Sequence, residues 1–301
     1  MAQQYPARAV RIVVPSAPGG GTDITARILA PKLSEQLGQQ FVVENRAGAG
    51  TMIGGEVVAR AAPDGYTLLM GISTLAINPA TYKKVPYDAL RDFAPISHVV
   101  SLPNVLVTHP SLPVKTVKEL IAFSRARPGE LYYASAGVGT SPHLSMELFL
   151  LMGGMKMVHV PYKGSGPGII DIVAGHVSVM TPSILGGIPH IKSGRLRGLG
   201  VTSTKRAGGV PDIPTIAEAG LPGYEAVQWF GLLAPAATPR EIVSRLHAET
   251  VRALQSAEVR NRLSADGADP VGSTPEEFAA FLRGETAKWA KVVRQAGITP
   301  E

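Results

Sequence analysis

Short apolar segments alternate with helical segments along most of the chain, and this alternation constrains the fold more than any other feature. Strands that alternate with helices at such spacing are typical of parallel βαβ units, so the sequence predicts an α/β protein. The expected strands cover residues 10–14, 41–44, 66–70, 105–108, 131–135, 157–160, 177–180 and 199–202. The expected helices include residues 116–127, 141–152, 166–174, 185–193, 240–254 and 275–295.

A further helix is expected directly after the first strand. Thr22 or Asp23 is its expected N-cap, Gly38 is its expected C-cap, and apolar residues recur at helical spacing between them. Pro31 removes a backbone hydrogen bond, so it predicts a kink or a break in this helix. Thr116 is the expected N-cap of the helix over 116–127.

Length and composition limit the class of protein. At about 100–200 residues per domain, 301 residues indicate two domains or one large one. Hydrophobic residues make up 45% of the chain and charged residues 17%, which is a globular rather than a disordered composition. The chain has no cysteine, which excludes disulfides, thiolate metal sites and cysteine nucleophiles.

Charge and hydropathy exclude two further classes. The net charge of +6 is spread along the chain and only 6% of the residues are aromatic, so we expect no nucleic-acid partner. No apolar run reaches the ~18 residues of a membrane span, so we expect no membrane insertion. The first residues show no signal peptide, which fits a cytoplasmic protein or a mature N-terminus preceded by Met1.

One order of elements occurs twice: strand, glycine-rich loop with a threonine, helix, strand. Residues 10–44 contain the loop PSAPGGGTD, and residues 131–160 contain the loop AGVGTSPH. The first turn of a helix has unpaired N–H groups and a partial positive charge, which bind phosphate or carboxylate. Two such helix ends that face each other across a cleft would form a clamp for an anion. Residues 163–168, KGSGPG, are interpreted as a loop before a buried helix, with a cleft rim as the alternative.

Motifs for cofactors and catalysis are absent from the sequence. The glycines of residues 45–55 are spaced G-x-G-x-x-x-G, one residue too long for the dinucleotide fingerprint, and there is no P-loop, so no nucleotide cofactor is expected. None of the 7 histidines forms an i, i+4 pair with another, so no metal site is expected. Neither G-x-S-x-G nor H-E-x-x-H occurs, which argues against an enzyme, although the fold alone can assemble a triad.

Seven segments follow one another in an order that resembles the Bug/TctC family, the periplasmic solute-binding proteins of tripartite tricarboxylate transporters. The resemblance covers nearly the whole chain from about Tyr5. The segments are VPSAPGGGTDITAR, VVENRAGAGTMIGG, ASAGVGTSPHLSMELF, VPYKGSGPGIIDIVAGHV, PHIKSGRLRGLGVTSTKR, PDIPTIAEAGLPGYEA and WFGLLAPAATP.

The resemblance implies a two-domain, periplasmic-binding-protein-like clamshell, with a central, mostly parallel sheet flanked by helices in each domain. Residues 1–100 and 227–301 would form domain I and residues 101–226 domain II, with the ligand cleft between them. The implied function is to capture a small carboxylate and deliver it to the permease subunits of a tripartite tricarboxylate transporter. The implied location is the periplasm, with the signal peptide removed or omitted from this chain, and the implied state is a monomer without cofactors.

The resemblance also assigns a ligand site. Backbone N–H groups of the two glycine loops, with ordered waters, would hold a ligand carboxylate, and hydroxyl groups would line the cleft. Asp23 is included at the end of the first loop, although a helix-start role explains it equally well. The candidate ligand-binding residues are Ser16, Ala17, Gly20, Thr22, Asp23, Ser73, Thr74, Gly139, Thr140, His143 and Ser183.

Two positions depart from the family pattern. Many members carry an aromatic residue at the position of Ser16, and many carry an acidic residue at the position of Ser178, followed by a Met-Phe-Asp-like run. That run is MTPS over residues 180–183 here. An acidic wall would suit a ligand ammonium, so its absence argues against amino-acid ligands. Tight binding of aspartate or glutamate, but not of their deaminated analogues, would contradict this hypothesis.

Two other functions stay open at this point. One is an α/β enzyme that acts on a small carboxylate or a phosphorylated metabolite, for which turnover would be the discriminating observation. The other is an orphan receptor that serves a sensor instead of a permease, which only the partner would reveal.

Overall fold

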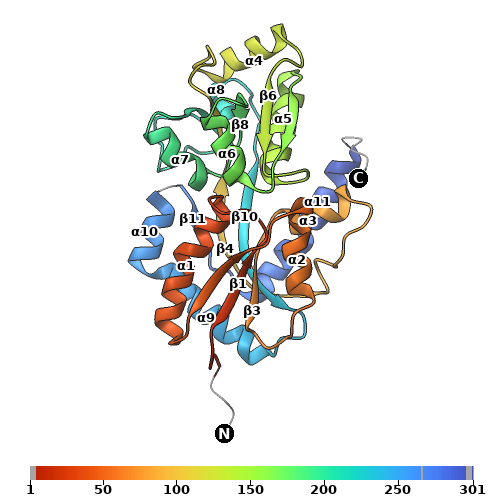
Figure 1. The fold of residues 1–301 in the computed structure, drawn as a ribbon, viewed down its shortest axis with the longest axis vertical. Coiled ribbons are helices and arrows are strands. Elements are labelled where there is room, and N and C mark those ends of the chain that lie inside the picture. Colours follow the sequence, from red (N-terminus) through yellow and green to blue (C-terminus); the bar gives the residue numbers. More distant parts are fainter. Residues whose placement is uncertain (1–4, 266, 296–299, 301) are drawn as a thin grey trace.

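Two β-sheets, each covered by helices, lie towards opposite ends of an elongated molecule in the computed structural model (Figure 1). The structure describes residues 5–265, 267–295 and 300. Within these residues, the larger sheet is formed by β1 (Val10–Val14), β2 (Phe41–Asn45), β3 (Thr67–Ile72), β4 (Phe93–Pro103), β10 (Val227–Pro235) and β11 (Asp269–Pro270). The smaller sheet is formed by β5 (Val105–Thr108), β6 (Tyr132–Ser135), β7 (Val158–Pro161), β8 (Val179–Met180) and β9 (Arg197–Val201).

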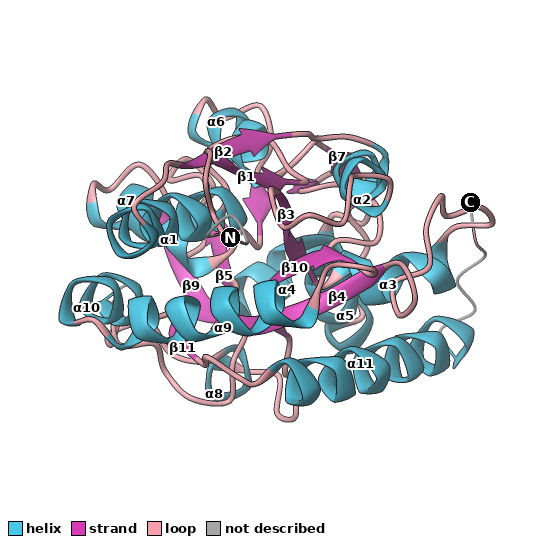
Figure 2. Cartoon of the chain, turned by 90° about the horizontal axis from the view of Figure 1, so that it is seen from below, coloured by secondary structure: helices cyan, strands magenta, loops and turns pink. Residues whose placement is uncertain are grey.

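Helices flank both sheets. We call the larger sheet and its helices lobe I, and the smaller sheet and its helices lobe II; α9 and α11 both pack against β4 in lobe I (Figure 2). Lobe I contains α1 (Gly21–Leu37), a 3-10 turn (Ala49–Thr51), α2 (Met52–Ala59), α3 (Thr74–Thr81), α9 (Arg240–Gln255), α10 (Ala257–Ala265) and α11 (Pro275–Gln295). Lobe II contains α4 (Val117–Ala126), α5 (Ser141–Gly153), α6 (Ser165–Val173), α7 (Ile184–Lys192) and α8 (Ile216–Ala219).

Three neighbouring strands of each sheet run parallel. The strand order is β11-β4-β10-β3-β1-β2 in lobe I and β7-β6-β8-β5-β9 in lobe II. β1 runs parallel to β2 and β3, and β6 runs parallel to β7 and β8. Helix α1 connects β1 to β2 and helix α5 connects β6 to β7, which confirms the two expected βαβ units. The sheets are mixed, because β10 runs antiparallel to β3 and β4, and β5 runs antiparallel to β8 and β9.

Strand β1 packs against a hydrophobic core on each of its two faces. Val10, Ile12 and Val14 face the main hydrophobic core, and Val13 faces a second core beneath α2 and α11. All four side chains are completely buried. A strand buried on both faces requires a continuous apolar run, which VRIVV provides apart from the half-buried Arg11. The loop after Val14 is therefore held at one edge of a rigid sheet.

The first helix differs from the sequence-based expectation at its start. It begins at Gly21 with Gly20 as N-cap, so the expected caps Thr22 and Asp23 are wrong and lie inside the first turn. The expected C-cap is confirmed: Gly38 adopts the left-handed conformation with φ 70°. The helix continues through Pro31 to Leu37, so the expected break does not occur.

Helix α4 begins as expected, whereas helix α3 differs from the expectation. Thr116 caps α4 as expected, because its hydroxyl accepts the Glu119 N–H over 3.1 Å. Helix α3 was not expected, since it is short and Pro79 interrupts its pattern. No helix in the described part of the chain is long and apolar enough to cross a membrane.

The chain passes between the lobes at two main places. Asn104 connects β4 of lobe I to β5 of lobe II, and the segment between β9 and β10 returns the chain to lobe I. β4 and β10 pair with each other along their length, so both crossings lie side by side. The expected domain limits, 1–100 with 227–301 and 101–226, stay a prediction.

Candidate functional site

The loops that follow the parallel strands gather at one edge of each sheet. Because β1 and β3 are parallel neighbours, the segments after Val14 and after Ile72 leave lobe I at the same edge. Because β6 and β8 are parallel neighbours, the segments after Ser135 and after Met180 share an edge of lobe II. Ligands of α/β proteins bind at such carboxyl edges.

These two edges face each other and touch. The Ala17 N–H donates to the Lys163 carbonyl over 2.9 Å, and the Tyr82 hydroxyl donates to the Val138 carbonyl over 3.3 Å. The loop over residues 15–20 thus lies against the start of α6, and α3 lies against the loop before α5. The site is the zone between these four segments.

Helix α1 begins with an uncapped first turn. Its N-cap, Gly20, is extended and provides no side-chain hydrogen bond. The first four N–H groups of a helix lack intrahelical acceptors and carry the positive end of the helix dipole. A Cβ at Gly21 would lie 2.0 Å from the Ser183 Oγ, so the hydroxyl of lobe II approaches this helix end directly. Backbone donors beside a hydroxyl are suited to bind an anion.

Asp23 organises the first loop. Its carboxylate accepts hydrogen bonds from the Gly19 N–H, the Arg27 Nε–H and the Asn45 Nδ2–H, each at 3.0 Å. Asn45 also donates to the Ser16 carbonyl over 2.9 Å. Burial raises the pKa of the Asp23 carboxyl, but the hydrogen bonds from Arg27, Gly19 and Asn45 outweigh it, so the pKa is lowered. Asp23 therefore stays ionised and holds the loop, and its oxygens are already occupied by protein donors.

Three buried hydroxyl groups at the facing edges form no hydrogen bond within the described residues. Ser16 follows β1, Ser73 follows β3 and Ser183 follows β8, and their exposed fractions are 7%, 2% and 2%. A buried polar group without a partner costs roughly 1–3 kcal/mol, and folded proteins keep few of them. Three such groups on facing loops point to a place that binds a polar ligand.

Two of the remaining candidates of lobe I, Thr74 and Ala17, have hydrogen-bond partners within the protein. The Thr74 Oγ1 lies 2.5 Å from the Thr51 Oγ1, and the Ala17 N–H is used in the contact with lobe II. The Gly20 carbonyl accepts the Ile24 N–H over 2.9 Å, which starts α1. Thr22 is buried in the first turn of α1.

The second loop is hydrogen-bonded to itself. The Gly139 N–H donates to the His143 Nδ1 over 3.2 Å. The Thr140 hydroxyl accepts the His143 N–H over 3.4 Å and donates to the Gly137 carbonyl over 2.6 Å. Pro142, in the first turn of α5, has no N–H. The two halves of the expected clamp are thus unequal, because α1 presents uncapped donors whereas most donors at the start of α5 are occupied.

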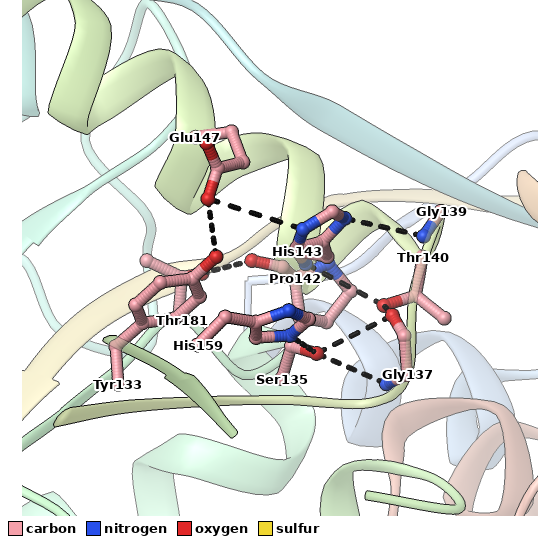
Figure 3. A network of polar contacts seen from close by, with 10 residues as sticks. All are labelled: Tyr133, Ser135, Gly137, Gly139, Thr140, Pro142, His143, Glu147, His159 and Thr181. Atoms are coloured by element: carbon pink, nitrogen blue, oxygen red, sulfur yellow. Dashed lines mark hydrogen bonds and ion pairs between the residues drawn. The ribbon is translucent and has the colours of Figure 1, made fainter. Parts of the chain in front are cut away.

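Two stacked imidazoles lie behind this loop (Figure 3). The ring centroids of His143 and His159 are 4.2 Å apart, and His159 also stacks on Tyr133 at 4.8 Å. Tyr133 donates to Glu147, whose carboxylate lies 3.9 Å from the His143 Nε2. Burial lowers the pKa of His143 to about 4, and burial together with the neighbouring His143 lowers the pKa of His159 to about 4. Both rings are therefore neutral at pH 7, which leaves the His143 Nδ1 able to accept the Gly139 N–H.

A serine and a histidine within this group could be mistaken for a catalytic pair. The Ser135 Oγ lies 2.6 Å from the His159 Nε2 (Figure 3). Ser135 is completely buried, however, and its Oγ also accepts the Gly137 N–H over 3.1 Å. A nucleophile must reach its substrate. The pair therefore supports the loop. In the described part of the chain, no group of three or more His, Asp or Glu side chains could hold a metal ion.

The KGSGPG segment lies at the contact between the lobes. A Cβ at Gly166 would lie 1.9 Å from the Pro18 carbonyl oxygen, and a Cβ at Gly164 would lie 2.7 Å from the Ala17 nitrogen. The backbones can approach this closely only because both positions are glycine. The sequence predicted a loop before a buried helix here, with a cleft rim as the alternative, and did not identify the contact with the loop over residues 15–20.

One departure from the family pattern lies away from the site. The Ser178 N–H donates to the Tyr132 carbonyl and its carbonyl accepts the His109 N–H, at the edge of lobe II opposite the loops. The segment over 181–183 does reach the facing edges, and it has no acidic side chain. The absence of an acidic wall therefore concerns this segment and not Ser178.

Comparison with known proteins agrees with this architecture. Two facing lobes with donor loops between them are an arrangement found in periplasmic binding proteins, whose lobes close around a ligand. The profile of the TctC family, described as "Tripartite tricarboxylate transporter family receptor", matches residues 25–298. The chain belongs to this family, which confirms the resemblance found in the sequence.

Relatives and solved structures are similar over nearly the full chain. BugT of Bordetella pertussis is 42% identical over 298 residues, which is 98% of this chain and 91% of BugT. The structure of Rhodopseudomonas palustris Rpa4515 with adipate is 40% identical, with a TM-score of 0.95 over 99% of this chain and 100% of that one. MatC from the same organism, with bound malate, is 34% identical, with a TM-score of 0.89 over 96% of this chain and 100% of that one.

Proposed function

We propose that the chain is a periplasmic receptor that binds a small carboxylate between its two lobes and delivers it to the permease of a tripartite tricarboxylate transporter. The ligand of this proposal carries no amino group. The family membership establishes a solute-binding receptor. The ligand class, the permease partner, the periplasmic location and a monomeric state are the proposal.

The observation that carries the proposal is the uncapped start of α1 beside buried hydroxyls that have no partner. We place one carboxylate of the ligand at the first-turn N–H groups of residues 21–23, with Ser16 and Ser183 as hydroxyl donors from the two lobes. Ser73 would donate from the neighbouring strand end. Arg27 is bound to Asp23, so the carboxylate would be held by neutral donors and by the helix dipole.

Similar proteins support the same ligand class. Rpa4515 was solved with adipate and MatC with malate, and both are dicarboxylates without an ammonium group. The segment over 181–183 offers no acidic partner for an ammonium group. Both lines favour a deaminated carboxylate over an amino acid.

Calorimetric titration of unfolded and refolded protein tests the proposal, because refolding removes any carried-over ligand. The titrants are adipate, malate, succinate, citrate, benzoate, aspartate and glutamate. We expect saturable binding of at least one amino-free acid without product formation. Turnover of any titrant would favour the enzyme alternative, and tight binding of aspartate or glutamate alone would refute the ligand class.

Binding of the acid identified by this titration should also depend on the proposed site. Ser183→Ala is expected to weaken the binding, whereas Ser124→Ala serves as the matched control. Ser124 is a buried serine of α4 in the same lobe whose hydroxyl likewise has no partner. Equal affinity of both variants would place the ligand elsewhere.

A further inference from the structure

Asn104 occupies the point where the chain passes from lobe I to lobe II. It lies between the last residue of β4 and the first residue of β5 and is completely buried. Most buried side-chain amides are hydrogen-bonded, and their partners show which segments they hold together.

The side chain of Asn104 joins both crossings to α5. Its Oδ1 accepts a hydrogen bond from the Gln228 Nε2–H on β10, the strand of the return crossing. Its Nδ2 group donates to the Ser141 Oγ over 3.0 Å and to the Ser145 Oγ over 2.7 Å. Ser141 is the first residue of α5, directly after the loop with Gly139 and Thr140. One amide thus connects two crossing strands to the helix that carries the second loop.

The backbone of Asn104 extends these connections to the other lobe II segment of the site. Asn104 forms an isolated antiparallel bridge with Ser183, and the next residue, Val105, donates to the Pro182 carbonyl over 2.9 Å. The Thr181 hydroxyl donates to the Pro142 carbonyl over 2.7 Å, which ties this segment to α5. The start of α5, whose preceding loop faces α3, and the 181–183 segment, which faces α1, are therefore fixed to each other and to the crossing residue.

Asn104 is also anchored on the lobe II side of the crossing. Its N–H donates to the Thr202 Oγ1 over 2.7 Å, and its carbonyl accepts the Thr202 N–H over 2.9 Å. Thr202 directly follows β9 and begins the return segment, and the Ala226 N–H near the end of that segment donates to the Thr202 carbonyl. Asn104, which directly precedes the first strand of lobe II, thus contacts the segment that leads back to lobe I.

We propose that Asn104 is a positioning residue that couples the relative rotation of the two lobes to the positions of the α5 first turn and Ser183. When the crossing strands bend, the amide carries the start of α5 and the 181–183 segment with them, so that both approach lobe I as one body. The proposal rests on the proposed function, because it assumes that these segments contact the ligand.

The test uses the absence of cysteine from the chain, which allows spin labels at single introduced cysteines. Leu151 on α5, Ile170 on α6 and Val42 on β2 are exposed, with exposed fractions of 75%, 68% and 52%. The pair 42–151 reports the distance from lobe I to α5, and the pair 42–170 reports the distance from lobe I to α6. Both pairs are measured with and without adipate, and the adipate affinity is measured by calorimetry.

In the otherwise wild-type protein we expect both distances to shift together on adipate binding. In Asn104→Ala we expect the 42–151 distribution to broaden and no longer to follow the 42–170 distribution, with adipate affinity ~3- to 30-fold lower, the range typical of residues in a coupling network. Ser145→Ala, which removes one acceptor on α5, is expected to act in the same direction more weakly. Ser124→Ala is the control and should leave both pairs unchanged.

If Asn104 had only a structural role, Asn104→Ala would lower the unfolding temperature, and the 42–151 and 42–170 distances would still shift together on adipate binding. That result, with adipate affinity within twofold of wild type, would overturn the proposal, and Ser145→Ala decides the same question if Asn104→Ala does not fold. If the wild-type chain fails to bind adipate, the adipate part of the proposed function fails. The proposal for Asn104 is then tested by the 42–151 distance distribution without adipate. A broader distribution in Asn104→Ala than in the wild type supports the proposal, and an equal one overturns it.

Discussion

Replacing Gly166 by alanine places one methyl group at the contact between the lobes. Gly166 lies in the first turn of α6, and its Cβ would lie 1.9 Å from the Pro18 carbonyl oxygen and 3.1 Å from the Pro18 carbonyl carbon. Carbon and oxygen atoms in contact are normally about 3.3–3.6 Å apart. The start of α6 and the loop over residues 15–20 would therefore have to separate by more than about 1 Å.

The size of the effect follows from two costs that apply only when the lobes touch. Forcing a methyl group into a filled contact costs about 1–3 kcal/mol. Loss of the neighbouring hydrogen bond from Ala17 to Lys163 removes about 0.5–1.5 kcal/mol. Together, about 1.5–4.5 kcal/mol would disfavour the arrangement in which the lobes touch, which would weaken carboxylate binding by roughly 10- to 2000-fold.

The same change should leave lobe II itself intact. Alanine is favoured over glycine within helices by roughly 0.5–1 kcal/mol, so the unfolding temperature without ligand should stay the same or rise slightly. Gly284→Ala is the matched control, because Gly284 lies within α11 and no heavy atom lies within 4 Å of its would-be Cβ. We expect this control to bind like the wild type.

The assay combines calorimetric affinity with the radius of gyration from X-ray scattering at saturating carboxylate. The wild type and Gly284→Ala should become more compact on binding, whereas Gly166→Ala should stay expanded. Wild-type affinity and full compaction in Gly166→Ala would contradict this prediction. They would show that the contact of Pro18 with Gly166 is absent from the liganded state.

Three further predictions concern single groups of the site. Asp23→Ala removes the acceptor that holds the first loop, so carboxylate affinity should fall by ~10-fold or more by calorimetry, and an unchanged affinity would show that the loop needs no such anchor. Burial lowers the pKa values of His143 and His159 to about 4 in the folded chain, against 6.5 for a free imidazole. Below pH 6.5 the folded state thus binds fewer protons than the unfolded state, and stability to urea should be greatest above pH 6.5 and fall from there to about pH 4. His159→Gln should reduce this slope, and an equal slope would contradict the assignment. Ser183→Ala should weaken carboxylate binding about 3- to 30-fold, and a result equal to that of the buried control Ser124→Ala would contradict its role as a donor.

Periodicity and turn residues predicted most of the regular structure. The run VRIVV has to be a central strand because both of its faces are apolar, and Gly38 ends α1 because its backbone has to be left-handed. The start of α1 was missed because Asp23, a good cap by type, turns its carboxylate towards Arg27 and Gly19 instead. Residue spacing alone cannot show whether the Asp23 carboxylate caps the helix or binds other partners.

The site was predictable as two loops but not as a set of contacts. Glycine runs after strands indicated where backbone would approach a ligand, and the loop over residues 15–20 does face lobe II. No sequence pattern indicates that His143 accepts the Gly139 N–H, because that contact depends on a neutral ring buried against His159. Nor does any pattern show that Asn104 connects the crossing strands, since its partners lie far away in the sequence.

A crystal structure of the refolded protein with the tightest-binding acid of the titrated panel would show directly whether the start of α1 binds the ligand. We expect a carboxylate oxygen about 2.7–3.2 Å from first-turn N–H groups of residues 21–23, with the Ser183 Oγ as a further donor. A carboxylate held by a lysine or arginine side chain, or bound away from the start of α1, would contradict this expectation.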